Sequence, residues 1–228
     1  MAVKTEAPKK SRTHTIYKKV DGTKVPGVTT VIGLYDDGKS GAFAHAAWKL
    51  GIAGIDYKEV WGKKRDTGTL CHYYIECDNK ENEPDKAYLE EFPQDIIDKA
   101  ETGFLGYLDW TKANVKQVLG SEVQLVDNEL GYGGTIDMPY VNTQNKVILG
   151  DYKTGKIYDT ARLQIAAYEN LWLVNNREPL QGKQIIQINS DDGLITAIPI
   201  GDLTREFELF KHLLAIYNLQ KELRREKK

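Results

Sequence analysis

The chain has 228 residues, of which 41% are hydrophobic and 28% are charged, with a formal net charge of −2 at pH 7. A chain of this length and composition can bury one sizeable core without a second domain. No apolar run approaches the ~18 residues that a membrane-spanning helix needs, and the N-terminal segment is too polar for a signal peptide. The sequence therefore argues against a membrane protein, and we expect a cytoplasmic location.

After a basic N-terminal arm, the sequence predicts both helices and strands. Residues 1–13 are rich in lysine, which is typical of a flexible terminus, and we expect a single domain over residues 14–228. Apolar spacing, β-branched runs and turn residues assign the elements. Helices are expected at about 29–34, 42–50, 69 onward, 94–115, 158–175 and 202–225, and strands at about 16–20, 24–25, 122–126, 132–141, 146–153, 184–189 and 194–199. This order predicts an α/β fold with a small central mixed sheet, flanking helices and an N-terminal helical wall.

The strand predicted at 146–153 carries a candidate catalytic pair. Successive side chains of a strand point to opposite faces, so Asp151 and Lys153 point the same way. The connection 142–145 joins this strand to the preceding one as an antiparallel hairpin, which can bring Asp137 opposite the Asp151 end. Two neighbouring carboxylates repel each other and raise one pKa unless a cation lies between them. A hard divalent ion, Mg²⁺ or Mn²⁺, satisfies both.

Two predicted helices place further polar side chains one turn apart. Gln164 and Tyr168 follow the hairpin directly, and their shared face can present an amide and a phenol to a phosphate or base, or can simply pack half-buried on the sheet. His72 and Glu76 have the same spacing upstream, and imidazole is a reasonable further ligand for a metal held by carboxylates. Glu76 and Glu122 rank below the other candidates, because each is equally well explained as a solvated charge.

These residues lie in four segments that resemble, in order and spacing, the motifs of the RecB-like branch of the PD-(D/E)xK nuclease superfamily. The segments are Gly68-Thr-Leu-Cys-His72, Gly134-Thr-Ile-Asp137, Asp151-Tyr-Lys153 and Gln164-x-x-x-Tyr168. The stretch from Ile16 to Ile32 is similar to the opening of phage-encoded and mitochondrial exonucleases of that branch, with Gly27 where those usually have serine. The resemblance covers roughly residues 16–175. It implies a restriction-endonuclease-like core and a metal-dependent DNA exonuclease of recombination, repair or replication that acts on linear ends.

Roles follow for the individual residues under this resemblance. Lys153 is expected to position or deprotonate the attacking water and to offset transition-state charge, while Gln164 and Tyr168 orient the substrate. The only cysteines, Cys71 and Cys77, are too few for the [4Fe–4S] cluster of some relatives, so no iron–sulfur cluster is expected. The cofactor expected is Mg²⁺, with Mn²⁺ as a substitute. Its expected ligands are His72, Asp137, Asp151 and the backbone carbonyl of Tyr152.

The charge distribution bears on the expected partner, DNA. A net charge of −2 is unusual for a protein that coats duplex DNA. Basic residues gather in the N-terminal arm, at 63–65 before the His72 helix and at 224–228, which suits DNA ends or single strands better than a broad duplex surface. An endonuclease with the same site and a non-catalytic DNA-end binding protein remain alternatives, as does an RNA substrate. A recombination protein is a further candidate partner, and a phage-encoded chain would act in the host cytoplasm.

Overall fold

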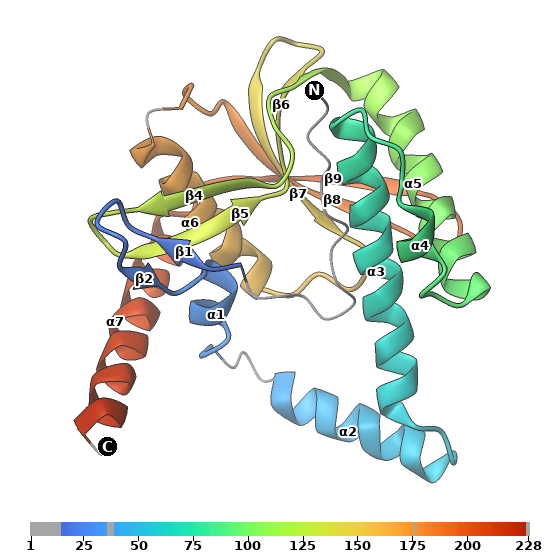
Figure 1. The fold of residues 1–228 in the computed structure, drawn as a ribbon, viewed down its shortest axis with the longest axis horizontal. Helices are drawn as coiled ribbons and strands as arrows, with labels where there is room; N and C mark the ends of the chain where they lie inside the picture. Colours follow the sequence, from blue (N-terminus) through green and yellow to red (C-terminus); the bar gives the residue numbers. More distant parts are fainter. Residues whose placement is uncertain (1–14, 36–38, 176, 227–228) are drawn as a thin grey trace.

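The computed structural model describes residues 15–35, 39–175 and 177–226, and the basic arm expected over residues 1–13 lies outside them. Within the described residues, helices pack on both faces of a central mixed sheet, as the sequence predicts (Figure 1). No described helix is long and apolar enough to cross a membrane.

The central sheet has five strands, and the antiparallel hairpin predicted through 142–145 is confirmed in it. Four pairings are present, of which only the one between the third and fourth strands of the sheet is parallel. The strand order is β3 (Val115–Val118), β6 (Met138–Asn142), β7 (Val147–Lys153), β8 (Gly182–Ile188) and β9 (Ile195–Ile200). The sheet is therefore mixed because β7 and β8 run in the same direction.

Two groups of helices cover the two faces of this sheet. One face carries α1 (Val28–Ile32), α6 (Thr160–Val174) and α7 (Thr204–Glu226). The other carries α3 (Tyr57–Asn79), α4 (Lys86–Leu89) and α5 (Gln94–Asn114). The helix predicted to end at 115 stops at Asn114, and the chain passes directly into β3, which was not predicted.

Side chains of β7 alternate between the two cores, as expected for an extended strand. Val147 and Leu149 are buried with α6 and α7, whereas Ile148 and Tyr152 are buried with α3 and α5. Asp151 continues the first set, so its carboxylate lies on the side of α6. The shared orientation predicted for Asp151 and Lys153 is confirmed, because the Lys153 ammonium contacts the Asp151 carboxylate.

The N-terminal helices do not form one wall. Helix α1 joins the layer of α6 and α7, whereas α2 (Lys39–Ile52) lies away from the sheet and packs against α3 (Figure 1). Helix α3 also begins well before the predicted start at Thr69, because the Asp56 side chain accepts a hydrogen bond from the backbone N–H of Lys58 at 2.9 Å and caps the helix there. The basic residues 63–65 are therefore part of α3 and do not precede it.

Two small sheets complete the fold. One pairs β1 (Tyr17–Lys18) with β2 (Lys24–Val25), and the other pairs β4 (Val123–Asp127) with β5 (Tyr132–Ile136). The continuous strand predicted over 132–141 is divided at Asp137, where the chain leaves the β4–β5 pair and enters the central sheet as β6. This junction brings the end of the small sheet against the end of β7.

Candidate active site

Asp137 lies at the β5–β6 junction and has an acidic neighbour on each side. In the β4–β5 pair the last antiparallel partners are Val123 and Ile136, and in the β6–β7 pair they are Met138 and Gly150. Both pairings therefore stop one residue short of Asp137. Continuing each register by one residue places Glu122 on one side of Asp137 and Asp151 on the other. The predicted proximity of Asp137 to the Asp151 end of β7 is thereby confirmed, and Glu122 is added to it.

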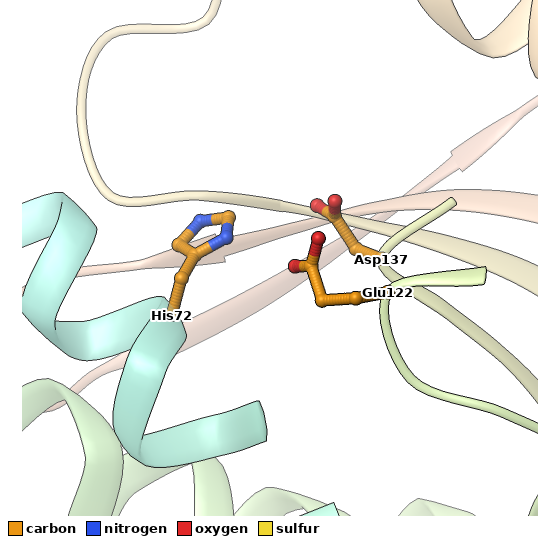
Figure 2. A group of neighbouring side chains, drawn as sticks. All are labelled: His72, Glu122 and Asp137. Carbon is orange, nitrogen blue, oxygen red and sulfur yellow. The ribbon is translucent and has the colours of Figure 1, made fainter. Parts of the chain in front are cut away.

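Three side chains from this junction and from α3 form a candidate metal site. Figure 2 shows the imidazole of His72 facing the carboxylates of Glu122 and Asp137. One ligand atom of each lies within 4.8 Å of the others. Octahedral ligands with bonds of about 2.1 Å are separated by roughly 3 to 4.2 Å, so small side-chain adjustments would fit them to one ion. One imidazole and two carboxylates are a suitable donor set for Mg²⁺ or Mn²⁺.

The backbone of Tyr152 faces the same position. Its N–H donates a hydrogen bond to Asp137 Oδ2 at 2.8 Å. This bond replaces the backbone hydrogen bond that Tyr152 would make if the pairing of β6 with β7 continued past Met138. In an extended strand the N–H and C=O of one residue point to the same side. The Tyr152 carbonyl therefore points toward the Asp137 side of β7. The Tyr152 ring packs edge to face on the imidazole of His72, with ring centroids 5.6 Å apart.

Glu122 has an unusual backbone for its residue type. Its φ is +53°, in the left-handed region, and its N–H donates to the backbone oxygen of Asp137 at 3.0 Å. Residues other than glycine in sparsely populated conformations cost about 1–3 kcal/mol each and concentrate at functional sites. On sequence alone Glu122 ranked as a solvated charge. Pairing the strands predicted at 122–126 and 132–141 as antiparallel neighbours, and counting back from the turn between them, would have placed it beside Asp137.

Asp151 is fully buried beside this cluster. Its Oδ2 forms an ion pair with Lys153, and its Oδ1 has no hydrogen-bond partner among the described residues. Burial raises the pKa of Asp151 to about 6, the Lys153 ammonium acts against this, and the carboxylate of Asp137 adds to it. A buried oxygen without a protein donor is rare and indicates a position that an ion, a water molecule or a proton satisfies.

Gln164 and Tyr168 form a hydrogen-bond chain that ends at Lys153. Lys153 Nζ donates to Gln164 Oε1 at 3.2 Å, and Gln164 Nε2 donates to the Tyr168 hydroxyl at 2.9 Å. Tyr168 is buried, and burial raises its pKa well above the usual value. A Cβ at Gly134 would lie 2.7 Å from the Tyr168 ring, so the glycine of this segment allows the ring to lie against β5. The Tyr168 hydroxyl therefore fixes the orientation of the Gln164 amide that accepts a hydrogen bond from Lys153.

His72 is brought to the cluster by a close approach of α3 to the end of β7. A Cβ at Gly68 would lie 2.5 Å from Thr154 Oγ1, so the glycine permits this close contact without a shift of the Thr154 side chain. His72 follows one turn later on the same face of the helix. Glu76 is a further turn along and pairs with Lys80, so its carboxylate is engaged outside the metal cluster.

Comparisons with known proteins do not define a family. No protein-family model matches the sequence, and no curated protein matches it. Among solved structures, the protein SSO0001 is 19% identical over 66% of this chain and 71% of that chain, with a TM-score of 0.35. A proposed exonuclease from Eubacterium rectale is 15% identical over 69% of this chain and 66% of that chain, with a TM-score of 0.44. The functional argument therefore depends on the geometry of the site.

Proposed function

We propose that this chain is a divalent-metal-dependent deoxyribonuclease with a RecB-like PD-(D/E)xK core, which hydrolyses phosphodiester bonds from the ends of linear DNA in recombination, repair or replication. One observation carries the proposal. The ligand atoms of His72, Glu122 and Asp137 lie within 4.8 Å of one another, beside the ion pair of Asp151 and Lys153. Hard ligands next to a positioned ammonium are the groups that metal-assisted hydrolysis of a phosphodiester uses.

His72, Glu122 and Asp137 would hold Mg²⁺ or Mn²⁺, and the Asp151 carboxylate and the Tyr152 carbonyl border the same position. When bound, such an ion polarises a phosphoryl oxygen, lowers the pKa of a coordinated water and stabilises the leaving oxygen. The N–H of Tyr152 fixes the orientation of the Asp137 carboxylate, which prepares one ligand before any ion arrives.

Lys153 supplies positive charge at the edge of the buried cluster. Its ammonium is held between the Asp151 carboxylate and the Gln164 amide, and its side chain is 25% exposed, so it can reach a bound phosphate or water. A positioned cation that faces the developing phosphorane charge stabilises the transition state. Gln164 and Tyr168 act by fixing this ammonium, which is a positioning role.

The preference for DNA ends is supported by the resemblance of the four segments and by the net charge of −2, which disfavours a broad duplex-binding surface. The test is incubation of the purified chain with Mg²⁺ and end-labelled linear single- and double-stranded DNA beside closed circles. We expect linear DNA to shorten and circles to stay intact. Asp137→Asn should abolish cleavage, whereas Glu76→Gln, outside the cluster, should not.

Three outcomes would change the assignment. Full cleavage in chelator would contradict the metal requirement. Nicked or linearised circles would favour an endonuclease that uses the same site. Binding of DNA ends without cleavage in either Mg²⁺ or Mn²⁺ would favour a non-catalytic DNA-end binding protein.

A further inference from the structure

Four aromatic side chains meet where α2, α3 and the loop after β7 come together. We call these residues the aromatic cluster: Phe43, Tyr57, Trp61 and Tyr158. Trp61 contacts Tyr57 and Phe43 edge to face, with ring centroids 4.9 and 5.4 Å apart, and the rings of Phe43 and Tyr158 are 6.0 Å apart. The ammonium of Lys156 lies 5.4 Å from the centre of the Tyr158 ring. The cluster therefore combines apolar ring surface with a positive charge.

The aromatic cluster is not part of either buried core. Phe43 is 41% exposed and the other three rings are half-buried. Helix α2, which contributes Phe43, lies away from the sheet (Figure 1). It also exposes Trp48 and Ile52. Partly exposed aromatic rings with basic neighbours are the arrangement on which unpaired bases stack.

One face of α3 connects the aromatic cluster to the candidate metal site. Trp61, Arg65, Gly68 and His72 follow one another at spacings of four, three and four residues, so they form a single stripe along the helix. The rise from Trp61 to His72 is about 16 Å at roughly 1.5 Å per residue. A strand stacked at about 3.4 Å per nucleotide spans that distance with roughly five nucleotides, and an extended strand needs fewer.

Positive charge lies between the two ends of this stripe. The Arg65 side chain is 73% exposed, and its partner is the adjacent Asp66 at 3.0 Å. Exposed ion pairs contribute little free energy, so a phosphate can replace Asp66 at small cost. The loop that follows β7 packs on the stripe at Gly68 through Thr154 and contributes Tyr158 to the aromatic cluster, so a bound strand would pass beside this loop.

We infer that the aromatic cluster binds unpaired bases of the DNA strand whose phosphate occupies the candidate metal site, with Arg65 and Lys156 near the intervening phosphates. The inference rests on the proposed function and adds a requirement to it. Bases inside a duplex do not expose their faces, so a blunt end must open before it can occupy the aromatic cluster. Single strands and unpaired ends are therefore bound more tightly than blunt duplexes. Stacking is tolerant of sequence, because every base has a π face.

The test compares two oligonucleotides that differ only in their bases. Binding of labelled oligo(dT) and of an abasic oligonucleotide of equal length is measured by fluorescence anisotropy in chelator, where cleavage is absent. Trp61→Leu should weaken oligo(dT) binding by about 5- to 150-fold and leave abasic binding unchanged, because stacking needs a base whereas phosphate contacts do not. Trp48→Leu, an exposed ring of α2 outside the cluster, should change neither affinity.

Equal loss of affinity for both oligonucleotides, or no loss for either, would overturn the inference and leave the aromatic cluster as an anchor for α2. If Trp61→Leu does not fold, Tyr158→Leu in the loop gives the same comparison with the same two outcomes. Tighter binding of oligo(rU) than of oligo(dT) would overturn the DNA assignment. Base-dependent binding without cleavage would refute the nuclease but keep this site, whereas cleavage without base dependence would refute this site alone.

Discussion

Replacing Asp151 with asparagine should stabilise the metal-free protein at neutral pH, although the same change should abolish cleavage. Asp151 is fully buried, and burial raises its pKa from the usual 3.8 to about 6. A shift of roughly two units means that the ionised carboxylate lowers the free energy of unfolding by up to about 3 kcal/mol, since each unit corresponds to about 1.4 kcal/mol. Asparagine has nearly the same shape and carries no charge.

The pH dependence follows from the direction of this shift. Because the pKa of Asp151 is higher in the folded state, the folded protein binds more protons than the unfolded chain between pH 3.8 and about 6. The stability that this carboxyl contributes is complete below pH 3.8 and is lost as the pH rises through about 6. The advantage of Asp151→Asn should therefore be about a third of its full value near pH 4.5 and complete above pH 7. For a chain of this size it corresponds to a rise in Tm of roughly 6–12 °C.

The assay is thermal unfolding of both proteins in chelator from pH 4.5 to 8, repeated with Mg²⁺. Mg²⁺ should raise the Tm of the wild-type protein more than that of Asp151→Asn, because a ligand stabilises only the folded state that binds it. Asp127→Asn is a matched control. Asp127 is also buried, but it accepts hydrogen bonds from two backbone N–H groups and from Asn170, so its neutralisation should destabilise the protein. An Asp151→Asn protein less stable than wild type at pH 7.5 in chelator would refute the reasoning.

Three further substitutions separate the roles within the site. Lys153→Ala should bind metal normally by calorimetry but cleave about 10²-fold or more slowly, the effect of losing one transition-state donor, and normal cleavage would remove Lys153 from the mechanism. Glu122→Gly should relieve the strain of the left-handed backbone and raise the free energy of unfolding in chelator by about 1 kcal/mol. The same change should weaken Mg²⁺ binding in calorimetry, and an unchanged Mg²⁺ affinity would exclude Glu122 as a ligand. Tyr168→Phe should lower the rate of cleavage and change the Tm by a few degrees at most, because the hydroxyl holds the Gln164 amide in place. A lower Tm with normal activity per folded molecule would show that the hydroxyl is purely structural.

The parts of the fold that depend on local patterns could be predicted from the sequence. Period-two alternation identified the faces of β7, and the turn residues at 142–145 fixed the hairpin that brings Asp137 beside Asp151. The helical spacing of Gln164 and Tyr168 placed them on one face, and the structure joins them by a hydrogen bond. These patterns need no knowledge of distant residues.

The parts that depend on distant contacts could not be predicted. The sequence predicted a helix start near Thr69, and Gly62 and Gly68 disfavour a helix locally, but α3 begins at Tyr57, where Asp56 caps it, and Gly68 packs close to Thr154. Strand β3 continues an apolar helical pattern and becomes a strand through its pairing with β6. Glu122 belongs to no motif, and its place beside Asp137 follows only from the register between the strands predicted at 122–126 and 132–141.

The two least favourable features of the site flank the same residue. Glu122 has a strained backbone on one side of Asp137, and Asp151 has a buried charge on the other. Each lowers the stability of the metal-free protein, and a divalent cation at Asp137 would offset the charge of both carboxylates. Strain and buried charge at one position are therefore better explained by ligand binding than by folding, which is where local rules are expected to fail. Substitutions here should raise stability while they remove activity, whereas substitutions in either hydrophobic core should lower both.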